Sequence, residues 1–381
     1  MPAPIDIAGF SSSVAYPSSI FSLEKHENYV YERFAYNIFR EGVRALHEKN
    51  LPVNLAVKFI PFGKLPAWAI NMSVKKSCES NGGFDVEIPE LLPPMILLFV
   101  KMISPHFEYD QTVCDQTLDA AVQDFANLGS AMVKDYRNFG LATAIRNAFE
   151  SGGIDFEYLG KNADTFDSVS YLMANHEIAH IYVLQLTNPP ASLDDAPAFE
   201  HLVDIIATEW QFRRYVMLTP DTKEYLNMRG LSQRSDALYE NCAWCMKAHF
   251  LLLLLMGFAG AQQSGGIFHF DSGKRHPGGF SRFWITLCWL QNAIAAEISK
   301  ELGEANSKKI GQYFKRSFDL ICSNGLISKK SLWQTVDEEQ LKHIDRVADL
   351  AEERGIAEVI IGKEFLKSRL ANAAAMRPKM K

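Results

Sequence analysis

In the first third of this chain, apolar positions recur both at helical spacing and in alternation. In the rest of the chain they recur almost only at helical spacing. In residues 24–50, apolar and aromatic side chains return every three or four positions, which predicts an amphipathic helix that ends before Pro52. Residues 53–61, 67–74 and 83–91 are short and partly alternating, and turn-forming segments separate them. This part of the chain therefore predicts one helix and three strands.

Beyond residue 111 the spacing of apolar residues is almost wholly helical. Helices are predicted at 115–140, 169–188, 194–218, 236–261 and 337–355, with a Gly-rich loop at 262–281. The sequence therefore predicts an α+β fold that is predominantly α-helical, in which a small antiparallel or mixed sheet precedes a helical bundle. We divide it into an N-terminal α/β region, a helical core and a C-terminal helical region, with boundaries at 1–110, 111–290 and 291–381.

The overall composition limits the kinds of protein that this chain can be. Of its 381 residues, 48% are hydrophobic, which suits a substantial core and excludes a disordered chain. A formal net charge of -6 gives no electrostatic footprint for nucleic acid, so none is expected as a partner. The strongest membrane candidate, 250–261, is shorter than the ~20 residues of a spanning helix, so no transmembrane anchoring is expected.

Cysteine usage and the N-terminal sequence bear on the cellular compartment. Six cysteines in a chain of this length do not form a disulfide framework. The first residues lack a charged segment followed by an apolar one, which a secretory signal would need. We therefore expect a cytoplasmic protein.

The clearest chemical pattern is the HExxH sequence formed by His176, Glu177 and His180. Because it fixes only three positions, two histidines that merely sit four apart in a buried helix are the alternative. Residues four apart project from one face of a helix, so both histidines can reach a single ion. Glu177, one position further round, could then take a proton from a metal-bound water.

The segment around this pattern is predicted to be a real helix. Residues 169–188 contain neither Gly nor Pro, and Ser168 or Ser170 could cap the N-terminus. The helix is expected to stop at Asn188, which two prolines follow. The HExxH residues therefore lie well inside it.

Two histidines do not complete a zinc site, and the next predicted helix offers the third ligand. Glu200 and Asp204 share a face there, and Glu200 follows His180 by 20 residues. We predict that Glu200 binds the metal and that Asp204 accepts a hydrogen bond from the outer nitrogen of a liganding histidine. Two solvated acids on an amphipathic helix are the alternative for this pair, and His201 and Glu209 are the alternative ligands.

HEIAH followed by ExxxD resembles the gluzincin metallopeptidases, particularly the type of the CAAX prenyl endopeptidase and the heat-shock peptidase. Members of that group carry a later loop with a His-Pro pair and an arginine six residues after the histidine, and here His276, Pro277 and Arg282 have that spacing. The resemblance implies a zincin-like core in which His276 and Arg282 lie near the metal and stabilise the oxyanion. An incidental His-Pro pair in a Gly-rich loop is the alternative.

These patterns together predict a soluble zinc-dependent endopeptidase that acts on an intracellular protein or peptide. Two neutral imidazoles and a carboxylate suit Zn²⁺ better than calcium or magnesium, although manganese or cobalt could replace it. Two other functions stay open. One is a regulatory or binding protein on a gluzincin scaffold. The other is a toxin or phage-defence protease triggered by a regulatory partner, similar in style to the phage-exclusion peptidases.

Overall fold

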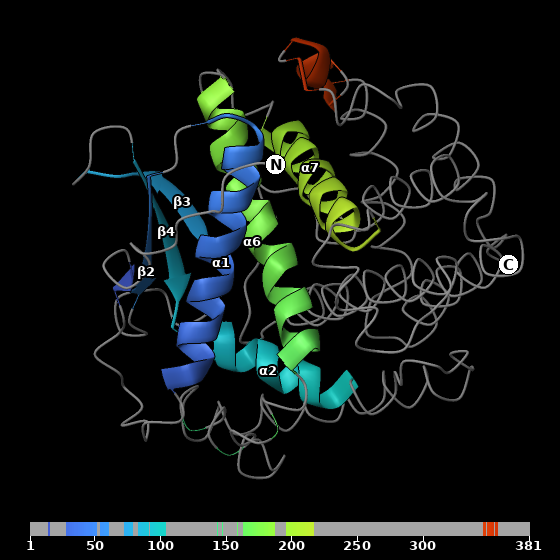
Figure 1. The fold of residues 1–381 in the computed structure, drawn as a ribbon. Helices are drawn as coiled ribbons and strands as arrows, with labels where there is room; N and C mark the ends of the chain where they lie inside the picture. Colours follow the sequence, from blue (N-terminus) through green and yellow to red (C-terminus); the bar gives the residue numbers. More distant parts are fainter. Residues whose placement is uncertain are drawn as a thin grey trace, which may run out of the picture. The chain divides into compact units, whose positions relative to one another are not determined.

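The described part of this computed structural model contains four strands and four long helices in the order β1, α1, β2, β3, β4, α2, α6, α7 (Figure 1). It divides into two compact units: the first contains the elements from β1 to α6, apart from the last residue of α6, and the second contains α7. The structure describes residues 14–15, 28–51, 54–60, 72–78, 83–90, 92–103, 143, 147, 158, 163–186, 196–216, 346–347, 349–353 and 355–356.

Helix α1, Asn28–Glu48, confirms the predicted amphipathic helix. Its end is capped by main-chain hydrogen bonds, in which the N–H of Leu51 donates to the Leu46 carbonyl and that of Asn50 to the His47 carbonyl, both at 3.0 Å. Asn50 has a φ of 55°, a left-handed conformation that Asn tolerates better than most residues. These bonds satisfy carbonyls that the end of a helix would otherwise leave without partners.

The strands form one small mixed sheet, which agrees with the predicted α+β class. The order is β1-β2-β4-β3; β1 and β4 pair with β2 in parallel, and β3 pairs with β4 antiparallel. The strand at 67–74 is predicted too early, because β3 begins at Ser73, while residues 61–71 lie outside the described part of the chain. The two-residue β1 is not predicted, since so short a strand shows no alternation. The strands span Val14–Ala15 (β1), Leu55–Ile60 (β2), Ser73–Lys76 (β3) and Phe84–Pro89 (β4).

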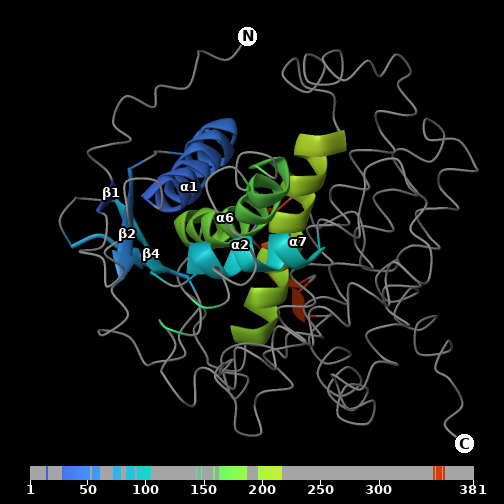
Figure 2. The ribbon, with the colours of Figure 1, turned by 90° about the horizontal axis from the view of Figure 1, so that it is seen from below.

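One face of this sheet packs against α1. The alternating side chains of β2 that include Val57 and Phe59 are buried, and the ring of Tyr31 on α1 meets the Phe59 ring edge-on with centroids 5.3 Å apart. On the opposite face the sheet carries charges, because Lys58 donates to Asp85 at 2.8 Å. The sheet is therefore apolar toward α1 and polar on its other side. Figure 2 shows α1 next to the strands.

Helix α2, Leu92–Ile103, follows the sheet and contacts α1. Its first turn contains Pro93 and Pro94, at positions where a helix has no use for the missing N–H groups. No helix is predicted at these residues, because their apolar side chains form a continuous run without helical spacing.

Helix α6, Ala163–Leu186, carries the HExxH residues, as predicted, and lies beside α1 (Figure 1). Asp167 ties the two helices together. Its carboxylate accepts two hydrogen bonds from the Arg33 guanidinium, both at 2.6 Å, and one from the Asn37 amide at 2.8 Å. Because the guanidinium donates two hydrogen bonds to one carboxylate, the contact fixes the relative orientation of the two side chains as well as the distance between them.

The predicted start of α6 is wrong. The helix begins at Ala163, so neither Ser168 nor Ser170 caps its N-terminus. The Ser170 hydroxyl instead donates to the Phe166 carbonyl one turn earlier, at 2.7 Å. A serine can therefore satisfy its hydroxyl within a helix and need not mark its start. The C-terminal end at Leu186 agrees with the predicted stop before two prolines.

We expect Asp167→Asn to lower the free energy of unfolding by about 1–3 kcal/mol, because a charged and partly buried acceptor of three hydrogen bonds is lost. The matched control is Glu48→Gln, which weakens the exposed Arg44–Glu48 pair. Such surface pairs contribute little, so we expect a change below about 0.5 kcal/mol. Urea unfolding measures both variants. Equal losses would show that Asp167 is no more important than a surface acid.

The C-terminal unit includes a short described stretch that agrees with the predicted helix 337–355. Its described residues between 346 and 353 are helical, and Gly355 follows with a φ of 63°. The Ile356 N–H donates to the Ala351 carbonyl at 2.9 Å, as at the end of α1.

The helices predicted at 115–140 and 236–261, the loop at 262–281 and the membrane candidate at 250–261 lie outside the described residues. Within the described part of the chain, no helix is long and apolar enough to cross a membrane.

Candidate metal centre

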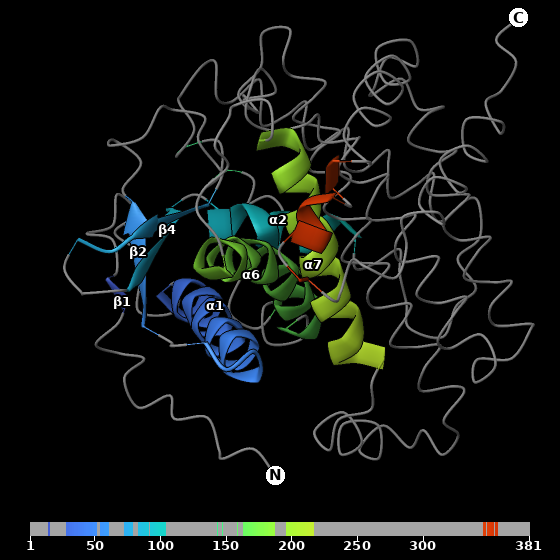
Figure 3. The same ribbon diagram turned by 90° about the horizontal axis from the view of Figure 1, so that it is seen from above.

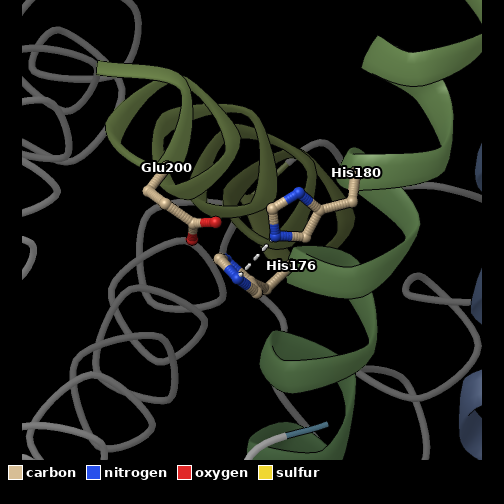
Figure 4. A group of neighbouring side chains, drawn as sticks. All are labelled: His176, His180 and Glu200. Carbon is tan, nitrogen blue, oxygen red and sulfur yellow. Dashed lines mark hydrogen bonds between the residues drawn. The ribbon is translucent and has the colours of Figure 1, made fainter. Parts of the chain in front are cut away.

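Helix α6 brings His176 and His180 together on one face. Their Nε2 atoms are 3.2 Å apart, and the two rings stand nearly perpendicular, with an interplanar angle of 88° (Figure 4). Two nitrogens bound to one tetrahedral zinc ion, each about 2.0–2.1 Å from it, would be about 3.3 Å apart. The spacing of the two nitrogens therefore suits a shared ion.

The third candidate ligand lies on α7, Ala196–Val216. Glu200 and Asp204 are one turn apart on this helix, and only 7% and 9% of their respective surfaces are exposed. This burial disfavours the alternative in which the pair is simply solvated, and the ligand role of Glu200 stays a prediction. Acidic side chains are rarely this deeply buried unless they are paired or bind a metal.

Ligand atoms of His176, His180 and Glu200 lie within 4.8 Å of one another (Figure 4). Among the described residues this is the group of three that could hold a metal ion, and neither His201 nor Glu209 belongs to it. Its donors are two imidazoles and one carboxylate, a set that zinc accepts and that leaves a fourth position open. The grouping favours Glu200 over the two alternative ligands.

Glu177 occupies the helix position next to His176. It is 7% exposed, and the two residues that follow it, Ile178 and Ala179, are completely buried. The role of Glu177 as a general base for a metal-bound water stays a prediction. Glu177 is not among the three candidate ligands.

The structure describes only some of the remaining predicted site residues. Asp204 is buried on α7, and its hydrogen bond to a liganding histidine stays a prediction. His276 and Arg282 lie outside the described residues, so their role near the metal also stays a prediction. Thr208 is not among the predicted site residues, although it is buried on α7 one helical turn after Asp204, as Asp204 is one turn after Glu200.

A comparison with models of known protein families found no match, and searches of curated proteins and of solved structures found no significant match either. The resemblance to gluzincins therefore stays a hypothesis that rests on the quoted motifs. A function for this chain has to be inferred from its own side chains.

Proposed function

We propose that this protein is a zinc-dependent endopeptidase in which His176, His180 and Glu200 hold the ion. The main support is the 3.2 Å separation of the two Nε2 atoms on a helix that also carries Glu177. Three protein ligands, two of them imidazoles, are typical of catalytic zinc sites, which keep a fourth position for water or substrate.

The proposed chemistry assigns a separate task to each side chain. Zinc, when bound, supplies a Lewis acid that polarises the peptide carbonyl and lowers the pKa of water to about 7. Glu177 takes the proton of the attacking water and passes it to the departing amine nitrogen. Asp204 accepts a hydrogen bond from the outer nitrogen of a histidine and fixes its orientation. His276 and Arg282 stabilise the negative charge that develops on the carbonyl oxygen.

The proposed fold around this site is a zincin-like core, and the proposed substrate is a peptide segment of an intracellular protein. Among the described strands, β3 lies at one end of the sheet order. An extended peptide could pair with such an edge through main-chain hydrogen bonds, which would give affinity without strict side-chain selection. We also propose that a regulatory partner could trigger the activity, as in a phage-defence protease. The compartment that we propose is the cytoplasm.

The test begins with metal analysis of the purified protein, for which we expect about one equivalent of zinc per chain because a single group of three ligands is proposed. The zinc-loaded protein is then incubated with a lysate of the host cell, and new peptide termini are mapped. A chelator-treated sample is the control. New termini that depend on zinc would support the endopeptidase. Bound zinc without any such terminus would favour a binding or regulatory protein, and absence of zinc binding would contradict the endopeptidase.

A further inference from the structure

Gly42 lies inside α1, six positions before the end of the helix. Glycine destabilises the interior of a helix relative to alanine, because it has more backbone freedom to lose on folding. A glycine at such a position therefore indicates that something packs close to the main chain.

The residues that approach Gly42 come from two directions. A Cβ atom placed on Gly42 would lie 2.8 Å from Cδ1 and 3.4 Å from Cγ1 of Ile178 on α6. It would also lie 2.7 Å from Cδ2 of Leu55 on β2. Carbon atoms in favourable contact are about 3.5–4.0 Å apart, so an added methyl group requires one or both neighbours to move. Both neighbours are buried and packed, which leaves little space for them.

Ile178 is the middle residue of the HEIAH sequence, two positions from each histidine. It is completely buried, and because it is β-branched its χ1 angle has few alternatives in a helix. A change of χ2, which would move Cδ1, needs space that a packed core does not offer. A clash with this side chain therefore displaces the main chain of α6, which carries His176 and His180. Figure 3 shows α1 beside both the strands and α6.

The contact between Asp167 and Arg33 limits how far α6 can move away from α1. It ties the N-terminal part of α6 to α1, two helical turns or more before the HExxH residues. Because this part is held, α6 can yield to a methyl group at Gly42 only by shifting or bending near Ile178. The histidine pair lies at that point of the helix.

We propose that Gly42 is a positioning residue for the metal centre. The absence of a side chain at Gly42 lets Ile178 pack against α1, and this contact sets the position of the α6 backbone that carries His176 and His180. The inference rests on the proposed metal-binding function, and it adds a residue on a different helix, far away in the sequence, to the determinants of that site.

The test uses Co²⁺, whose visible absorption reports the number and arrangement of its ligands. In Gly42→Ala we expect Co²⁺ affinity to fall about tenfold or more, as for other residues that orient metal ligands, and the absorption spectrum to change. Adding Ile178→Val to Gly42→Ala removes the Cδ1 methyl group in the way, and we expect it to restore the spectrum and most of the affinity. Ile178→Val alone should keep the wild-type spectrum.

The matched control adds Leu55→Val to Gly42→Ala, which relieves the crowding on the side of the sheet only. We expect this variant to recover stability without recovering the spectrum. An unchanged spectrum in Gly42→Ala, or equal recovery by both second substitutions, would overturn the inference. If Gly42→Ala does not fold, recovery of folding and Co²⁺ binding through Ile178→Val alone supports the inference, and any other result overturns it. Absence of Co²⁺ binding by the wild type would overturn the proposed metal centre, and the inference with it.

Discussion

Replacement of Glu177 by glutamine is expected to lower kcat/KM for peptide hydrolysis by about 10²–10⁴, because an amide of nearly the same shape cannot accept the proton of the attacking water. Zinc binding is expected to stay close to one equivalent, since Glu177 is not among the three candidate ligands. The measurements are initial rates on a peptide that spans a mapped cleavage site, and metal content of the purified variant. Loss of activity with retention of zinc separates a general base from a ligand.

The control for this experiment is Glu48→Gln, which makes the same chemical change on α1. The Glu48 side chain is 58% exposed and pairs only with Arg44 among the ion pairs of the described residues. We expect its kcat/KM to equal that of the wild type. Full hydrolysis by a zinc-loaded Glu177→Gln variant would show that the proton moves through another group, and the proposed role of Glu177 would then be wrong.

The elements that the sequence predicts well are those whose spacing of apolar residues matches their burial. Helix α1 and strand β2 are examples, since their buried residues return with the helical and the two-residue period respectively. Helix α2 shows the limit, because a helix covered on several sides carries a continuous apolar run and loses its period. The predicted start of α6 is wrong for a different reason. Ser170 can satisfy its hydroxyl inside a helix as well as at its end.

The candidate site shows the same division between local and distant information. The closeness of His176 and His180 follows from helical geometry alone, so the sequence predicts it. The pairing of Arg33 with Asp167 joins residues 134 positions apart, and no local pattern marks it. Gly42 stands out in the sequence as a glycine within a helix, but only the structure shows that Ile178 is what approaches it.

The third ligand is predicted in part by local spacing and in part by a contact between residues on different helices. The ExxxD spacing predicts that Glu200 and Asp204 share a face of the helix, but it does not predict which residues pack against that face. His201 and Glu209 are buried on the same helix, so burial alone does not identify the ligand either. The choice of Glu200 depends on its membership in the group with the two histidines. It can be tested without reference to any substrate.

Replacement of Glu200 by glutamine is expected to weaken zinc binding on the order of a hundredfold. Zinc sites with four protein ligands bind with about 10–16 kcal/mol, so one ligand contributes about 2.5–4 kcal/mol, and each 1.4 kcal/mol is a factor of ten. Zinc affinity is measured by competition with a chromophoric chelator. Glu209→Gln is the matched comparison, because Glu209 is a buried glutamate of the same helix at 2% exposure, and His201→Ala completes the set. We expect both to bind zinc as the wild type does. A large loss in either, with Glu200→Gln unaffected, would transfer the third ligand to that residue, and the chemistry of Glu177 would then operate beside a differently placed carboxylate or imidazole.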